Sequence, residues 1–164
     1  MASGHHQSPR RLTVLLSALL LFHILAAIVW VGGMFFAYVI LRPVLGNEEG
    51  PQRLRIWVNV LSKFFPWVSA SIGILFLTGF AMIYLFGGFS SIGVYIYIML
   101  ILAILMAAIF KFILVAPFQH LKRGVEEQKW ETAAYALGTI RKLVLTNLTI
   151  GIIIIVNAIA LKAI

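Results

Sequence analysis

Four long apolar stretches separated by polar connections dominate the pattern of this chain. They cover residues 12–41, 64–86, 92–115 and 143–161. Each stretch approaches or exceeds the roughly 20 apolar residues that an α-helix needs to cross a hydrocarbon layer of about 30 Å. The stretches lack the alternation that a lipid-facing barrel strand requires. The pattern therefore predicts an all-α, polytopic membrane protein, with four transmembrane helices in an antiparallel bundle.

The connections between the stretches predict further elements. The short, uncharged GGFSSIG of residues 87–93 indicates a tight antiparallel pair of spans. In the first connection, helical spacing separates an apolar face from a polar one: Leu54, Trp57, Leu61 and Phe64 against Arg53, Arg55, Asn59 and Lys63. We expect an interfacial helix there that bends at Pro66 into the second span. Residues 116–142 predict amphipathic cytoplasmic helical extensions with a break near Gly124.

Composition agrees with this class and limits the chemistry. Hydrophobic residues make up 62% of the 164 residues and charged residues 11%, against about 45–50% and 25% in soluble domains. The absence of cysteine excludes disulfides, iron–sulfur clusters and thiolate metal sites. The spans contain no nucleophile–base pair and no phosphate-binding glycine loop. We expect residues 1–11 to form a disordered tail and residues 12–164 a single transmembrane domain.

Basic residues indicate the orientation of the chain. Nine Lys and Arg residues lie in the connections 42–63 and 116–142, and three flank the termini. The positive-inside rule then places both connections in the cytoplasm and both termini in the periplasm of a bacterial inner membrane. The net charge of +8 is therefore expected to contact membrane lipids, and no nucleic acid.

His23 is the most informative polar residue within the spans. Ala27, Trp30, Met34 and Tyr38 follow it at helical spacing on one face. Gly32 and Gly33 would let another helix or a flat group approach the backbone. A neutral imidazole is a good axial ligand for haem iron and a common ligand for copper. The alternative is a buried histidine that hydrogen-bonds to an asparagine or a hydroxyl group.

Counting residues from the span centres suggests neighbours for His23. At a rise of 1.5 Å per residue, His23 lies at the same depth in the membrane as Thr78, Met99 and Asn157 on the other spans. Met99 is a candidate second axial ligand, with lipid-facing packing as its alternative. Asn157 or Thr78 would fix the imidazole tautomer. Asn147 is expected to form an interhelical hydrogen bond.

A group of basic residues near the cytoplasmic ends of the spans forms a second candidate site. Its members are Arg42, Lys111, Arg141 and Lys142. Such a basic collar could hold an acidic group, for example a haem propionate or a lipid phosphate. The alternative is an ordinary belt of positive residues at the membrane surface.

Several segments resemble the small CopD-like (copper-resistance protein D) bacterial membrane proteins. They are FHILAAIVWVGGMFFAYVILRP, RLRIWVNVLSKFFPWV, LTGFAMIYLFGGF and APFQHLKRGVEEQKWETAAYALGTIRKLVLTNLTIG. The histidine, tryptophan and glycines of the first span also resemble the HemJ-type protoporphyrinogen oxidases, which implies a haem b ligand at His23. The chain departs from the HemJ pattern at Tyr95, Tyr97 and Lys111, and this argues against protoporphyrinogen oxidation.

These observations lead to three functional hypotheses. The first is a haem b protein with a redox or electron-transfer role, in which Trp30, Tyr97 and Met99 line the pocket. It includes a haem-dependent membrane oxidoreductase, with a redox partner or a quinone. The second is a copper-handling membrane transport protein that uses His23 and methionines such as Met34, Met82, Met99 and Met106. The third is a non-catalytic assembly subunit of a membrane complex. The chain could also form a homo-oligomer.

Overall fold

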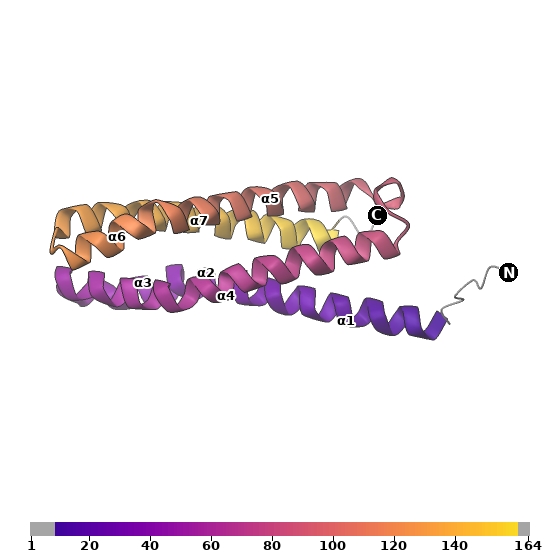
Figure 1. Ribbon diagram of the computed structural model, residues 1–164, viewed down its shortest axis with the longest axis horizontal. Helices are drawn as coiled ribbons and strands as arrows, with labels where there is room; N and C mark the ends of the chain where they lie inside the picture. The colour runs from indigo at the N-terminus through magenta and orange to yellow at the C-terminus, as the bar shows by residue number, and fades with distance from the viewer. Residues whose placement is uncertain (1–8, 161–164) are drawn as a thin grey trace.

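The computed structural model describes residues 9–160, and this range is helical almost throughout, without a strand. Four of its helical segments are long and apolar enough to cross a membrane: Arg10–Asn47, Gly50–Leu85, Val94–Glu126 and Trp130–Ile159. They lie along a common axis in up-and-down order (Figure 1). The predicted all-α architecture with four membrane-spanning helices is confirmed.

The first span changes helix type along its length. It runs through α1 (Pro9–Ala27), η1 (Ile28–Gly32), α2 (Gly33–Phe35), η2 (Phe36–Leu41), α3 (Arg42–Val44) and η3 (Leu45–Asn47). Segments η1 and η2 are π-helical, so each turn there holds more residues than an α-helical turn. Because of this wider turn, Trp30, Met34 and Tyr38, which are four residues apart, lie on the same side of the helix. Helix α1 already begins at Pro9, within the expected tail, and residues 1–8 of that tail lie outside the described range.

The second span is one helix, α4 (Gly50–Leu85). The helix expected to lead into the second span with a bend at Pro66 is part of this one helix, which continues through Pro66. Its buried side chains form an unbroken face on both sides of the proline: Leu54, Trp57, Leu61, Phe65 and Val68. Packing along this face holds the helix together where proline removes a backbone hydrogen bond.

The second half of the chain contains η4 (Phe89–Ser91), α5 (Val94–Val115), α6 (Pro117–Glu126) and α7 (Trp130–Ala160). The turn between α6 and α7 falls at residues 127–129, where Gln128 has a φ of 56°, and not near Gly124 as expected. Gly124 stays helical because it is a contact point. A Cβ atom there would lie 3.0 Å from the Ala133 backbone nitrogen, so glycine lets α6 pack closely against α7.

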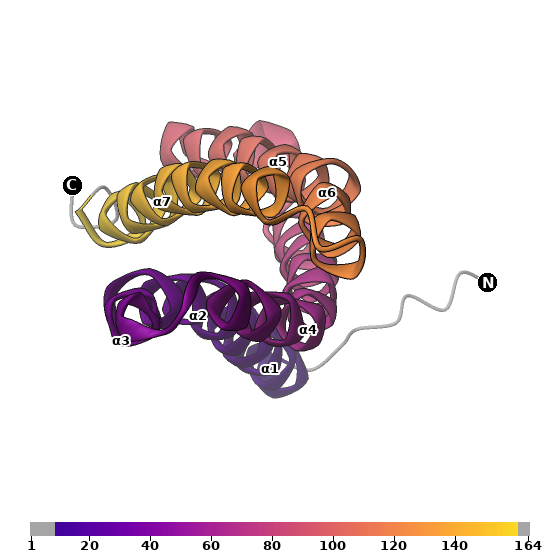
Figure 2. The same cartoon turned by 90° about the vertical axis from the view of Figure 1, so that its left-hand side faces the viewer.

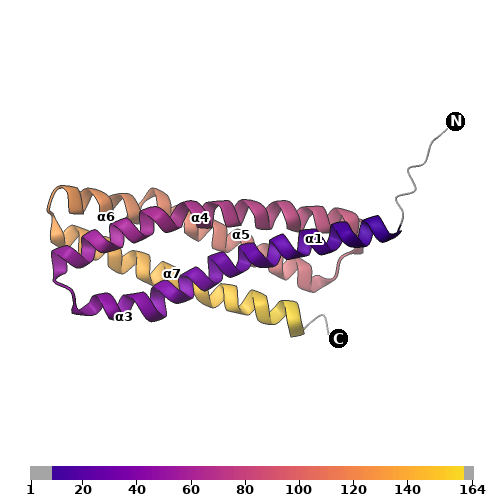
Figure 3. The ribbon, with the colours of Figure 1, turned by 90° about the horizontal axis from the view of Figure 1, so that it is seen from below.

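The helices pack as two groups with one shared core. Helix α1 packs on α4, and α7 packs on α5 and α6. Figure 2 shows the first span and α7 facing each other across the bundle, with α4, α5 and α6 closing one side. The groups meet through aromatic side chains: the Phe65 ring lies 5.4 Å from Phe110 and 4.8 Å from Phe118, centroid to centroid. This core lies toward the end of the bundle that carries the two charged connections (Figure 3).

Gly33 is a point of close approach between the first span and α4, whereas Gly32 is not. A Cβ atom at Gly33 would overlap the Phe64 ring, and one at Gly32 would meet nothing within 4 Å. Of the two glycines expected to permit close approach, Gly33 has this role in the structure.

This difference predicts opposite effects of alanine at adjacent positions. Gly32→Ala should raise stability by up to about 1 kcal/mol through helix propensity. Gly33→Ala should lower it by about 1–3 kcal/mol, because the Phe64 ring must move. Thermal unfolding of the purified protein in detergent measures both. Equal midpoints for the two variants would contradict the close packing at Gly33.

Candidate functional site

His23 lies on α1 and packs directly against α4. Its Nδ1 atom is 2.8 Å from the Thr78 hydroxyl oxygen. Gly79 makes room for the ring, since a Cβ atom at Gly79 would lie 3.5 Å from the His23 Cε1 atom. The imidazole is half-buried. Thr78, predicted to lie at the same depth as His23, is therefore in contact with it, as expected.

The hydrogen bonds of Thr78 determine which ring nitrogen of His23 carries the proton. The Thr78 hydroxyl group donates to the carbonyl oxygen of Ile74 at 2.6 Å, the usual bond of a threonine within a helix. With the single hydrogen of the hydroxyl group assigned to this bond, its oxygen accepts from the Nδ1–H of His23. This assignment places the lone pair of the imidazole on Nε2, as in histidines that ligate a metal through that atom.

The other residues predicted around His23 lie in separate places. Trp30 and Met34 are buried in the core, and the Trp30 ring lies 6.5 Å from that of Phe110. On α5, the Tyr97 hydroxyl group donates to the carbonyl oxygen of Phe89, and Met99 is half-buried. Trp30 and Met34 line a small apolar pocket to which Tyr97 and Met99 do not contribute.

Two asparagines join α7 to α5. Asn147 is buried and donates from Nδ2 to the carbonyl oxygen of Met106 at 3.0 Å. This is the interhelical hydrogen bond expected for that residue. Asn157 donates to the carbonyl oxygen of Tyr95 at 3.0 Å. The Thr78 hydroxyl group, and not Asn157, is the hydrogen-bond partner of His23.

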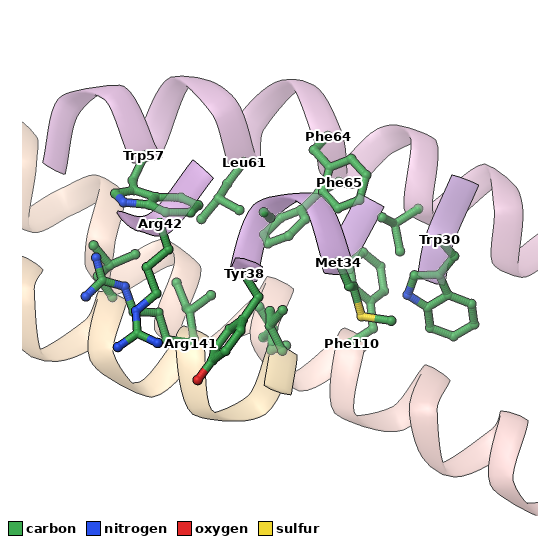
Figure 4. Close-up of a pocket in the computed structure, with 16 residues that line it drawn as sticks. Trp30, Met34, Tyr38, Arg42, Trp57, Leu61, Phe64, Phe65, Phe110 and Arg141 are labelled. Atoms are coloured by element: carbon green, nitrogen blue, oxygen red, sulfur yellow. The ribbon is translucent and has the colours of Figure 1, made fainter. Parts of the chain in front are cut away.

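A basic cavity that is wide open to the surface lies at the other end of the first span. Its volume is about 420 Å³. It is lined by Tyr38, Val39, Arg42, Pro43, Gly46, Arg53 and Arg141. Three helical segments contribute one guanidinium group each: Arg42 and Arg53 lie 11 residues apart, and Arg141 comes from α7, far along the chain. Figure 4 shows Arg42, Arg141 and Tyr38 together at one end of a neighbouring apolar pocket, with Trp30 and Met34 at the other.

Side-chain contacts hold the arginines of this cavity in place. The guanidinium carbon of Arg42 lies 5.0 Å from the centre of the Tyr38 ring. That of Arg141 lies 5.8 Å from the centre of the Trp57 ring. Both arrangements are cation–π contacts. The Nε atoms of Arg53 and Arg141 are buried and have no hydrogen-bond partner.

The structure brings together two members of the predicted basic collar and adds a third residue. Arg42 and Arg141 line the cavity, whereas Lys111 and Lys142 are exposed and do not. Arg53 was expected on the polar face of its helix, opposite Leu54 and Trp57. Its Nε atom is instead buried. The spacing of four between Arg53 and Trp57 is the sequence signal that places them on one side.

The described residues contain no cluster of the side chains that most often bind metal ions. No cluster of three or more His, Cys, Asp or Glu side chains there could hold a metal ion. The chain has no cysteine, and its sulfur-containing side chains are those of its methionines.

The fold and these sites define a helical membrane protein of four spans with a half-buried histidine and a basic cavity. The sequence profile of the copper resistance protein D family matches residues 58–161. The chain belongs to this family. The match begins within α4, so the first span, with His23, lies outside it. No curated protein and no solved structure matches the chain.

The hydrogen bond between His23 and Thr78 predicts a specific mutational effect. Thr78→Val keeps the shape of the side chain but removes the acceptor of the Nδ1–H bond. It should lower the free energy of unfolding by about 0.5–2 kcal/mol, the range for interhelical hydrogen bonds in membranes. Thr78→Ser, the matched control, should retain most of the stability. Equal stability of the valine variant and the wild type would contradict the bond.

Proposed function

We propose that this CopD-family membrane protein uses Nε2 of His23 as the ligand of one redox-active centre, haem b, in a redox or electron-transfer role. The observation that carries the proposal is the 2.8 Å contact between Nδ1 of His23 and the Thr78 hydroxyl oxygen, which assigns the proton to Nδ1 and the lone pair to Nε2. Haem b supplies one-electron chemistry when it is bound. Met99, the second ligand that the sequence suggested, lies on α5, whereas His23 packs against α4, so His23 carries the proposal by itself. A quinone or a protein is the proposed redox partner.

The surroundings of His23 suit this role in two respects. Hydrogen bonding of the non-ligating nitrogen fixes the ring orientation and raises the basicity of a metal-ligating imidazole. The Thr78 hydroxyl group would serve this purpose for His23. The ring is also only half-buried, so part of it remains open to a cofactor at the boundary of α1 and α4.

Visible absorbance of the purified protein tests the haem proposal. Protein from cells supplied with ample haem should show a Soret band that His23→Ala abolishes. His120→Ala is the matched control, because His120 is exposed on α6 outside the apolar stretches, and it should leave the band unchanged. A colourless wild-type preparation, or a band that survives His23→Ala, would refute the proposal.

Copper handling is the second candidate, and family membership favours it. In this case copper is the transported cargo. Met82 follows Gly79 by three residues, on the side of α4 that contacts His23. Its thioether and the imidazole are both ligands that copper accepts. Metal analysis of the same preparations would find stoichiometric copper, lost in His23→Ala, and deletion of the gene would make cells copper-sensitive.

An assembly role is the remaining alternative. It predicts a protein without haem and without copper that copurifies with a larger membrane complex. A stable homo-oligomer without other subunits would count against it.

We further propose that the protein lies in a bacterial inner membrane with both termini in the periplasm. The nine basic residues of the two long connections support this orientation. Because the chain has no cysteine, single cysteines report it cleanly. In intact spheroplasts an impermeant maleimide should label Ser90→Cys and should label Asn47→Cys only after lysis; both positions are exposed. The reverse pattern would invert the proposed topology.

A further inference from the structure

The arginine cavity contains three positive charges that form no salt bridge within the described residues. The one salt bridge within residues 9–160 joins Lys129 and Glu127, away from Arg42, Arg53 and Arg141. The charges of Arg42 and Arg53 both act on Arg141, so the three guanidinium groups repel one another. Gathering like charges without an opposite charge is unfavourable.

Buried donor atoms add to this imbalance. The Nε atoms of Arg53 and Arg141 are shielded from solvent and have no partner. Most buried polar atoms in folded proteins have a hydrogen-bond partner, so unpaired ones call for an explanation, such as an ion. Two unpaired donors beside one cavity point to an anion that accepts hydrogen bonds from several guanidinium groups.

We propose that the cavity binds the phosphate group of an anionic membrane lipid. Arginine suits phosphate because its planar fork donates two parallel hydrogen bonds to the oxygens. The cavity also lies at the right depth. Apolar stretches end at Leu41 and begin at Leu143, next to Arg42 and Arg141, so the arginines lie at the level of the lipid headgroups.

The surroundings of the cavity fit the rest of a lipid. Val39, which lines the cavity, and Val44 are 47% and 62% exposed, and they offer an apolar surface to acyl chains beside the cavity. The neighbouring apolar pocket has a volume of only about 40 Å³, too small for an acyl chain. The headgroup therefore occupies the cavity, and the chains stay in the surrounding bilayer.

This site is independent of His23. Nineteen residues separate His23 from Arg42, which corresponds to about 28 Å along a helix. A haem bound at His23 does not span that distance with its propionate groups. The lipid site can therefore be tested, and can fail, separately from the proposed function.

Lipid-dependent stabilisation of the full-length protein tests the proposal. In detergent, phosphatidylglycerol should raise the midpoint of thermal unfolding, and phosphatidylcholine should not. Native mass spectrometry should find phosphatidylglycerol bound to the protein. Arg53→Gln and Arg141→Gln should each increase the lipid concentration needed for half the effect by about 30-fold or more, the usual result of removing one partner of a buried charged pair.

Two matched variants remove the same charge from the same helices outside the cavity. They are Arg55→Gln, where the native side chain contacts the Trp130 ring at 5.4 Å, and Lys142→Gln, beside Arg141. Both should respond to phosphatidylglycerol like the wild type. An equal loss of response in these controls would overturn the proposal in favour of diffuse attraction to the membrane surface.

Two further measurements complete the test. Arg53→Lys keeps the charge without the planar fork, and its response should lie between those of the wild type and Arg53→Gln. Inorganic phosphate identifies the source of the phosphate group. If it stabilises the wild type as strongly as the lipid does, and Arg53→Gln removes the effect, the site binds the free ion and the lipid assignment is wrong.

Discussion

The lack of water in a bilayer core is the constraint on which this structure depends. Polar groups there must find partners within the protein. His23 bonds to Thr78 and thereby ties α1 to α4. Asn147 and Asn157 bond to backbone carbonyl groups and tie α7 to α5. Hydrogen bonds of the spans thus define the same two groups that helix packing does, and the aromatic core joins these groups to each other.

The same constraint explains why the two ends of the bundle differ. The buried core gathers toward the charged connections, where α6 and the beginnings of α4 and α7 add side chains. Toward the other end, large apolar residues are exposed, among them Leu77 at 74% and Val94 at 73%. Such residues are stable in contact with lipid. Association of helices there depends on specific contacts, because lipid tails are as apolar as the side chains themselves.

The sequence was sufficient to predict features that follow from a regular hydropathy pattern or from the depth of a residue along a span. The spans follow from hydropathy, and the Thr78 contact follows from counting 1.5 Å per residue on antiparallel helices. Features that depend on packing between distant segments were not predictable in the same way. Helix α4 continues through Pro66, with buried side chains on both sides of the proline, and the turn after α6 begins three residues beyond Gly124, which packs against Ala133.

Arg53 is the clearest example of a site residue that local pattern misplaces. In isolation its helix face looks polar, and only the approach of Arg42 and Arg141 from two other segments makes it part of a cavity. The two candidate sites differ in whether the protein itself supplies a hydrogen-bond partner. His23 has a hydrogen-bond partner within the protein, the Thr78 hydroxyl group. The arginine cavity lacks such an internal partner in the described chain, and its stability therefore depends more directly on a bound anion.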